Sequence, residues 1–282
     1  MQGDPDSAAQ QAAPRLPLVV DPAILERHLG APWLRVVDLS KADIYARFHV
    51  PGAVPLDYAR LVTTRGPARG ALPDAEQLAD VLSSIGLTAD MHVVAYDDEG
   101  GGKAGRLLWT LDVLGHRHMS LLDGGLHAWL NEGHPTSDEP AVVSSSTYPV
   151  NAARGGVADA EYIMERLGDA RMAILDVRAP REYMGLTRSA MRNGHIPGAV
   201  NLEWTFAMDP SRNLRLRPDE ELRTVLEERG VTPDKEVIVH CQTHHRSAHT
   251  YILLKALGYP RVLGYAGSWS EWGNREDTQV EE

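Results

Sequence analysis

Residues 195–200 read His195-Ile-Pro-Gly-Ala-Val200, and the same pattern stands earlier as His49-Val-Pro-Gly-Ala-Val54, at an offset of 195 − 49 = 146. Other matches keep the same order, such as Asp38 with Asp176 (176 − 38 = 138) and Trp129 with Trp272 (272 − 129 = 143). Ordered matches at slowly changing offsets indicate a duplicated domain. Two units are too few for a solenoid, so the sequence predicts two tandem domains.

The change of offset from 138 to 146 predicts an insertion of eight residues in the second half, within the stretch Met184–Asn193. The stretch 137–150 is polar and rich in Ser and Pro, which is typical of a linker. We therefore expect a disordered tail at residues 1–16, a first domain at 17–136, the linker at 137–150 and a second domain at 151–282.

Short apolar runs alternate with helix-like stretches in each half. In the second half, residues 173–175 and 237–240 are predicted strands, and residues 219–229 and 247–257 are predicted helices. Alternating strands and helices predict the α/β fold class, with a mostly parallel sheet flanked by helices in each domain.

The composition excludes several classes of function. The chain has 28 basic and 39 acidic residues and a net charge of −11, which argues against nucleic-acid and anionic-membrane binding. Its longest apolar runs are too short to span a membrane, and its polar N-terminus is unlike a secretory signal. A single cysteine excludes an internal disulfide. We expect a cytoplasmic protein and a monomer.

The single cysteine stands in Val237-Ile-Val-His-Cys-Gln-Thr-His-His-Arg-Ser247, where a predicted strand leads into a short loop and a helix. No Asp or Glu occurs from Val237 to Ser270, so the local field should favour anions. Backbone amides that converge in the loop, together with a helix N-terminus, would lower the pKa of Cys241 and make it a nucleophile. Arg246 would be the main anion-binding side chain, and Gln242, Thr243, His244 and His245 complete the predicted site.

The spacing of Cys241 and Arg246 bears on the substrate. Four residues separate them, one fewer than in phosphatases that use Cys and Arg around a phosphate. A tighter ring favours a cysteine that carries one extra sulfur atom over one that carries a phosphoryl group. A thiolate phosphatase or arsenate reductase remains the alternative enzyme class.

The first half lacks this chemistry. The offset of Gly86 and Gly230 (230 − 86 = 144) places Asp97 opposite Cys241, with Asp98 and Glu99 beside it. A loop with three acids repels anions and has no soft nucleophile. We expect the first domain to be catalytically silent and to form part of the wall of the other domain's pocket.

These motifs together resemble the two-domain rhodaneses, the thiosulfate:cyanide sulfurtransferases. The tandem halves, the two His-x-Pro-Gly-Ala motifs, Leu175-Asp-Val-Arg178 and the loop Cys-Gln-Thr-His-His-Arg carry the resemblance, and the loop is very similar to that of a bacterial rhodanese subgroup. The resemblance covers about Pro17 to the C-terminus. It implies a persulfide on Cys241 that receives the outer sulfur of thiosulfate, releases sulfite, and gives the sulfur to cyanide or another thiophile, without a cofactor.

The chain departs from the animal-type members at three positions. Those enzymes hold thiosulfate with a lysine where Thr243 stands here and with an arginine where Glu182 stands. Arg246 in turn occupies the last loop position, where they have threonine. The donor must therefore be held differently. The residues of the loop, Cys-Gln-Thr-His-His-Arg, also argue against mercaptopyruvate as the substrate.

Other residues have a structural and a functional interpretation. Trp204 and Arg178 are further candidates for the pocket, although Trp204 is equally compatible with a core position and Arg178 with a salt bridge to Glu182. A zinc site of Cys241, His244 and His245 is the less favoured alternative, because adjacent histidines on a tight loop rarely converge, and we expect no metal. The remaining candidates are expected to pack or to organise loops: His240, His249, the repeated pairs His49 and His195, Asp38 and Asp176, and the tryptophans Trp269 and Trp272.

The sequence leaves the acceptor open. A small anionic sulfur donor and a thiophilic acceptor are the expected partners. A protein acceptor is also compatible with the loop, in which case the chain would be a persulfide carrier or sensor and not an enzyme with a small acceptor.

Overall fold

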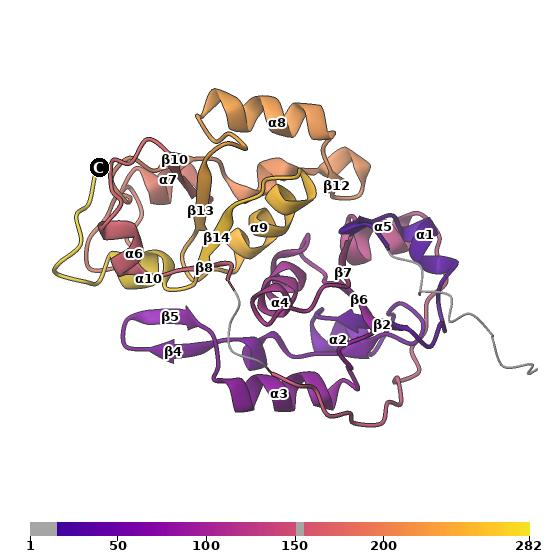
Figure 1. Cartoon of the computed structure of the whole chain (residues 1–282). Helices are drawn as coiled ribbons and strands as arrows, with labels where there is room; N and C mark the ends of the chain where they lie inside the picture. Colours follow the sequence, from indigo (N-terminus) through magenta and orange to yellow (C-terminus); the bar gives the residue numbers. More distant parts are fainter. Residues whose placement is uncertain (1–15, 151–154) are drawn as a thin grey trace, which may run out of the picture.

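The computed structural model describes residues 16–150 and 155–282, so most of the predicted tail lies outside the described residues. Each half contains a five-stranded sheet in which all neighbouring strands are parallel. Parallel strands need crossover connections, and helices supply most of them here. The predicted α/β class with two similar domains is confirmed (Figure 1).

The first half is built on a sheet with the order β1-β7-β6-β2-β3. In chain order its strands and helices are β1 (Val19–Val20), α1 (Pro22–Glu26), β2 (Leu34–Asp38), α2 (Ala42–Tyr45), β3 (Val54–Pro55), the 3-10 helix η1 (Tyr58–Leu61), β4 (Thr63–Arg65), β5 (Ala68–Ala71), α3 (Ala75–Ser84), β6 (His92–Tyr96), α4 (Gly102–Val113), β7 (Met119–Leu122) and α5 (Gly125–Asn131). Strands β4 and β5 form a separate antiparallel hairpin.

The second half repeats this order as β8-β14-β13-β9-β10. Its elements are β8 (Val157–Ala158), α6 (Ala160–Met164), β9 (Met172–Asp176), α7 (Pro180–Tyr183), β10 (Val200–Asn201), η2 (Trp204–Ala207), β11 (Met208–Asp209), η3 (Pro210–Arg212), β12 (Arg215–Leu216), α8 (Asp219–Glu228), β13 (Glu236–His240), α9 (Arg246–Ala256), β14 (Val262–Tyr265) and α10 (Ser268–Trp272). Strands β11 and β12 form the hairpin that corresponds to β4–β5. The predicted strands at 173–175 and 237–240 and the predicted helices at 219–229 and 247–257 are confirmed as β9, β13, α8 and α9.

The strand bounds reproduce the offsets of the sequence repeat. Strand β9 begins 172 − 34 = 138 residues after β2, and β10 begins 200 − 54 = 146 residues after β3. The eight extra residues therefore lie between α7 and β10, as predicted. This inserted segment has no helix or strand of its own.

The repeated polar residues organise the ends of equivalent strands, as expected. Asp38 and Asp176 each accept the backbone amide of the residue two positions later. His49 stacks on Tyr45 with ring centroids 3.9 Å apart, and His195 stacks on Tyr183 at 3.8 Å. Each histidine also pairs through Nδ1 with the carbonyl of the tyrosine on which it stacks. Their presence in both halves reflects packing.

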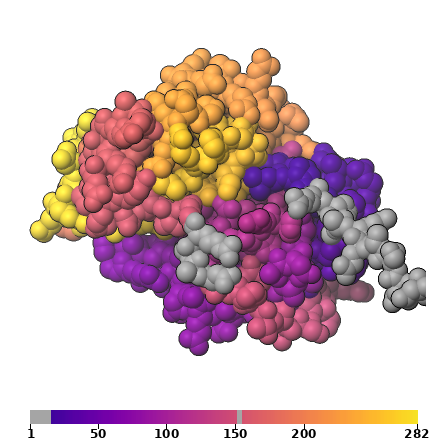
Figure 2. All heavy atoms as spheres, viewed as in Figure 1, coloured from indigo at the N-terminus to yellow at the C-terminus, as the bar shows by residue number. Residues whose placement is uncertain are grey.

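The two halves pack closely on each other through equivalent helices, α4 and α9 (Figure 1). Gly105 of α4 allows this approach, because a Cβ at that position would lie 2.7 Å from Cα of His249 in α9. One cluster of buried apolar side chains continues from the first half into the second and includes Trp109, Leu107, Ile252 and Leu253. In the space-filling view the second half sits directly on the first (Figure 2). A shared core of this kind fixes the relative position of the domains.

The predicted linker runs along the first half. His49 and Ser137 exchange backbone hydrogen bonds, and the Ser146 amide donates to the carbonyl of Ser83. Tyr148 is buried and hydrogen-bonds His116. No helix in the described ranges 16–150 and 155–282 is long and apolar enough to cross a bilayer.

Candidate active site

The loop after β13 holds the only cysteine. Strand β13 ends at His240, and α9 begins at Arg246, so residues 241–245 connect a central strand to a helix N-terminus. The start of α10 holds the loop from outside: the Trp269 amide donates to the Cys241 carbonyl at 3.0 Å, and the Cys241 amide donates to Ser268 Oγ at 3.4 Å. His244 has a φ of +54°, a left-handed conformation of the kind that turns successive amides toward one point.

The Cys241 thiol is completely buried but lies in a polar environment. Burial alone would raise its pKa, yet the charge of Arg246, the hydroxyl and amide of Ser247 and the amide of Thr243 together lower the pKa below the ordinary value of a thiol. A buried cysteine that only fills space has no such donors. The loop therefore stabilises an anion at the sulfur position.

Arg246 is held by Glu182 of α7. The pair is bidentate, with Nη1 to Oε2 at 2.6 Å and Nη2 to Oε1 at 3.0 Å, and both side chains are largely covered. Burial would lower the pKa of Arg246, but Glu182 and Cys241 raise it above the ordinary value, so the guanidinium stays charged. Glu182 stands where animal-type rhodaneses have a cation, and Arg246 stands where they have a neutral residue. Two of the three departures noted in the sequence, Glu182 and Arg246, are thus the two halves of one ion pair.

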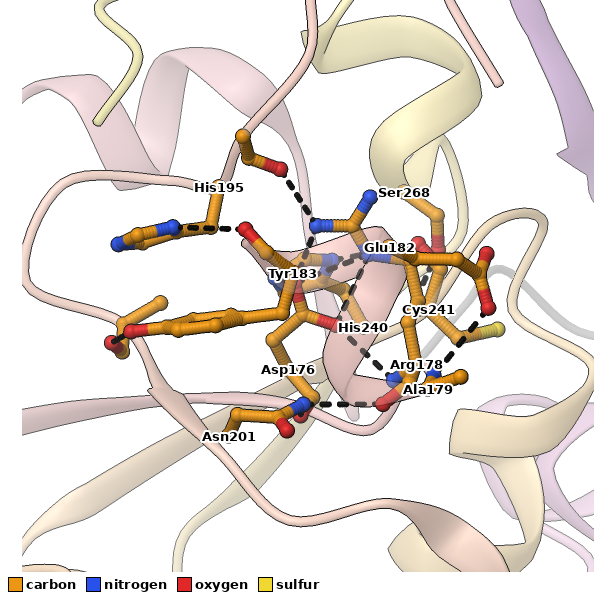
Figure 3. Close-up of polar contacts among 12 residues, drawn as sticks. Asp176, Arg178, Ala179, Glu182, Tyr183, His195, Asn201, His240, Cys241 and Ser268 are labelled. Atoms are coloured by element: carbon orange, nitrogen blue, oxygen red, sulfur yellow. Dashed lines mark hydrogen bonds and ion pairs between the residues drawn. The ribbon is translucent and has the colours of Figure 1, made fainter. Parts of the chain in front are cut away.

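Arg178 does not pair with Glu182, which corrects that alternative. It is fully buried and forms a salt bridge with Asp176 at 2.6 Å, and it also donates to the Gly194 carbonyl at 2.8 Å. Its guanidinium lies over the ring of Trp269, with Cζ 4.5 Å from the ring centroid. In Figure 3, the Asp176–Arg178 pair lies between His195 and Cys241. Breaking a buried pair costs about 3–5 kcal/mol, so the geometry favours a structural role.

Gln242 and Thr243 bring neighbouring segments to the loop. Gln242 Nε2 donates to the Ser189 carbonyl of the inserted segment at 3.0 Å, and the opposite oxygen of its amide is buried without a partner among the described residues. The Thr243 carbonyl lies against β5 of the first half, where a Cβ at Gly70 would stand only 2.0 Å from it. The first half therefore forms part of the wall around the loop.

The two loop histidines point to different partners. His244 is fully buried, its Nδ1 pairs with Ser247 Oγ at 2.8 Å, and its ring lies 4.3 Å from that of Trp109 in the first half. Burial, aided by the charge of Arg106, lowers its pKa well below the ordinary value, so His244 is neutral. His245 instead pairs through Nε2 with Glu99 of the first half. Of the two loop histidines, only His245 is placed to add positive charge to the loop.

Trp204 lies at the start of η2 and is partly buried. Its ring centroid is 5.6 Å from that of His249, in an edge-on arrangement, and 6.3 Å from that of His245. The side chain therefore contacts both the histidine at the end of the loop and the helix that follows.

Several residues near the thiol were not among the sequence candidates. The hydroxyl and the amide of Ser247 both act to lower the pKa of Cys241. Arg106 of α4 is fully buried and donates to the carbonyls of His244, Leu61, Gly70 and Ala71. The pairing of Glu182 with Arg246 had a signal in the sequence, because both residues differ from those of the animal-type rhodaneses at the same positions. The contacts of Arg106 with His244 and of Glu99 with His245 had no signal in the sequence, since these contacts depend on how the two halves pack.

The corresponding loop of the first half holds a carboxylate in place of the thiol. Asp97 is fully buried and accepts the amides of Glu99 at 3.0 Å, Gly101 at 2.8 Å and Ala104 at 2.9 Å. Burial, with the charge of Glu99, raises the pKa of Asp97 although the amides oppose this. The position equivalent to Arg246 is Gly102, so this loop has no counterpart of the Arg246 guanidinium.

The model of the rhodanese-like domain matches the chain twice, over residues 21–132 and 159–275. The chain belongs to the rhodanese-like family. A protein of Azotobacter vinelandii named thiosulfate sulfurtransferase is 51% identical over 266 residues, which cover 94% of this chain and 97% of that relative. A Pseudomonas aeruginosa protein of the same name is 50% identical over 94% of this chain and 97% of its own.

Two further similarities concern a carrier and a solved structure. The sulfur carrier protein TtuD of Thermus thermophilus is 34% identical over 89% of this rhodanese-like chain and 91% of its own. The fold is also that of the anaerobic ergothioneine biosynthesis enzyme from Chlorobium limicola, with a TM-score of 0.81 and 23% identity over 94% of this chain and 70% of that one.

No three His, Cys, Asp or Glu side chains in the described ranges lie together as metal ligands. Of the zinc ligands considered from the sequence, His244 pairs with Ser247 and His245 pairs with Glu99. The two rings thus have separate partners.

Proposed function

We propose that this rhodanese-like protein is a thiosulfate sulfurtransferase that carries sulfur as a persulfide on Cys241. The observation that carries the proposal is the polar ring around the thiol, in which Arg246, Ser247 and the Thr243 amide lower the pKa of Cys241. The names of the relatives at 50% and 51% identity support the substrate class. A thiolate is the reactive form in attack on sulfur, so the environment fits the chemistry.

The reaction takes place in two displacements at sulfur. The Cys241 thiolate attacks the outer sulfur of thiosulfate; a new S–S bond forms as the old one breaks, and sulfite leaves with the electron pair. Cyanide, or another thiophile, then attacks the outer sulfur of the persulfide, and the thiolate leaves with its pair. Both intermediates are anionic, so the same amides stabilise the thiolate and the persulfide.

In this proposal Arg246 is the main side chain that binds the donor. Its two Nη atoms bind Glu182, so a sulfonate group competes with that carboxylate or displaces it. Gln242, Thr243 and His245 line the approach to the sulfur, with Trp204 beside them. His244 and Arg178 act through packing, in view of their burial and their partners.

The donor reaches Cys241 only when covering side chains move, because the thiol has no exposed surface. Arg246 and Glu182 retain 21% and 17% exposure. We propose that their ion pair opens as the donor enters. The single thiol further supports action in a reducing compartment such as the cytoplasm, and we propose that the chain acts as a monomer.

The test compares the wild-type protein with Cys241→Ser, which preserves the size of the side chain. Wild type should gain the mass of one sulfur atom on exposure to thiosulfate, lose it on exposure to cyanide, and release thiocyanate. Cys241→Ser should do none of these. Thiocyanate production by the serine variant would refute the proposal.

A protein acceptor is the second candidate, and the inserted segment favours it. Met184, Leu186 and Met191 are 48%, 63% and 71% exposed. The same segment contacts the active loop through Ser189 and Gln242. Exposed apolar side chains next to a reactive group are typical of protein contact sites, and methionine adapts to varied partners.

The acceptor can be tested with sulfur-loaded enzyme. Transfer to a peptide with one cysteine between apolar residues should be faster than transfer to free cysteine. Replacing the three exposed side chains by serine should remove this advantage and leave transfer to cyanide unchanged. Equal rates for the two thiols in wild type would exclude a docking role for the segment.

A further inference from the structure

An ion pair joins the active loop to the silent loop. His245 follows the cysteine by four positions, and Glu99 follows Asp97, the counterpart of that cysteine, by two. Nε2 of His245 contacts Oε1 of Glu99, and the two side chains are 27% and 32% exposed. The pair therefore lies at the boundary between the halves, partly shielded from water.

The neighbours of the pair leave one side of the imidazole open. Tyr58 of η1 meets the ring of His245 edge-on at 5.2 Å, and Trp204 of η2 lies at 6.3 Å. Nδ1 of His245 has no hydrogen-bond partner among the residues that the structure describes. Glu99 thus occupies one ring nitrogen and leaves the other for a ligand.

Other charged and titratable groups act on the pair. Lys103 lies 3.5 Å from Glu99 and binds Asp98 at 3.0 Å. The remaining groups that interact electrostatically with His245 or Glu99 are Asp97 from the silent loop, Tyr58 from η1, and Cys241, His244 and His249 from the active loop and α9. Glu99 is the one acid in direct contact with His245 among the described residues.

The protonation state of His245 determines what Nδ1 offers to a donor. In a neutral ring that donates from Nε2 to Glu99, Nδ1 is a lone pair, which repels a sulfonate oxygen. In the imidazolium, Nδ1 is an N–H donor. Burial alone would lower the pKa of His245, but Glu99, together with the thiolate of Cys241, raises it above the ordinary value.

We infer that Glu99, in the loop that has no thiol, is a positioning residue that holds His245 as a cation whose Nδ1–H binds the sulfonate end of the donor. The inference rests on the proposed sulfurtransferase function. It gives the silent half a part in donor binding beside that of Arg246, whose guanidinium has to leave Glu182 before it binds the donor.

The sign of the pH dependence follows from the pKa directions. His245 keeps its proton above the ordinary pKa of about 6.5, and donor binding weakens as the pH rises through the raised value. The acid limb of kcat/KM belongs to Cys241, whose thiolate is lost as the pH falls. Removing the charge of Glu99 lowers the pKa of His245, so the alkaline limb moves to lower pH.

The experiment measures kcat and KM for thiosulfate against pH in full-length Glu99→Gln. We expect KM at pH 8 to rise about tenfold and the alkaline limb to move down by about one pH unit, the effect of one nearby opposite charge. Discharge of the loaded enzyme to cyanide should change less than twofold. Asp98→Asn is the matched control, because it removes one charge from the same loop at a residue that binds Lys103 and not His245.

A double-mutant cycle separates positioning from general destabilisation. In a His245→Gln background, Glu99→Gln should have no further effect on KM, and Glu99→Asp in the wild-type background should restore part of the affinity. Equal pH profiles for Glu99→Gln and Asp98→Asn, or additive effects in the cycle, would overturn the inference. Those results leave sulfur loading of Cys241 intact, so they are distinct from failure of the proposed function.

Discussion

The two loops at residues 97 and 241 form the same anion site and use it differently. Asp97 fills its loop with a carboxylate that accepts three amides, and Cys241 places a thiol among the amides and hydroxyl of its own loop. At Asp97, the effect of burial is larger than that of the amides, so the pKa of the carboxyl group is raised. At Cys241, the charge of Arg246 helps to lower the pKa of the thiol. The comparison teaches that both loops direct donors at the same position, and that the balance favours an anion only in the loop that a guanidinium follows directly.

The largest effect is expected from moving the thiol to the other loop. In a Cys241→Ser background, Asp97→Cys should leave thiocyanate production at the level of Cys241→Ser alone, at least about a thousandfold below wild type, as expected when a nucleophile is lost. The physical reason is that Gly102 supplies no charge and Glu99 repels the donor. Sulfur loading of the new cysteine, seen by intact mass, would show that amides alone suffice.

A smaller effect is expected on stability. Asp97→Ala leaves three amides, two of them buried, without an acceptor, which should lower the free energy of unfolding by about 3 kcal/mol, at about 1 kcal/mol for each lost hydrogen bond. Cys241→Ala should cost only about 1 kcal/mol, because a thiol is a weaker acceptor and the group is small. Urea unfolding of both variants at neutral pH measures the difference. Equal losses would mean that the two loops depend on their anions to the same degree.

The smallest effect concerns the wall that the first half provides for the active loop. Gly70→Ala places a Cβ against the Thr243 carbonyl and should displace the loop, with a fall in kcat/KM of about tenfold, below the roughly hundredfold cost of a 1 Å misplacement of reacting groups. Thr64→Ala in the same hairpin truncates an exposed side chain of β4 and serves as the control. An unchanged kcat/KM in Gly70→Ala would mean that the active loop tolerates movement.

Much of the fold could be predicted because the chain repeats itself. Two copies of one pattern constrain each other, so the offsets located the strands, the insertion after α7 and the replacement of the cysteine by Asp97. The loop chemistry was also visible, since a single thiol in an acid-free stretch implies a local positive field. The alternative salt bridge from Arg178 to Glu182 was wrong, because Asp176 lies two residues away and both it and Arg178 are buried together.

The sequence by itself determined the duplication and the α/β class and singled out Cys241 as the proposed nucleophile, because these depend on local periodicity and on residue type. The tertiary structure alone decided that Glu182 binds Arg246, that His244 packs on Trp109 while His245 binds Glu99, and that Arg106 holds the loop from the other half. These contacts join residues far apart in the chain. Their partners are chosen by how the two halves dock along α4 and α9, which no local pattern encodes.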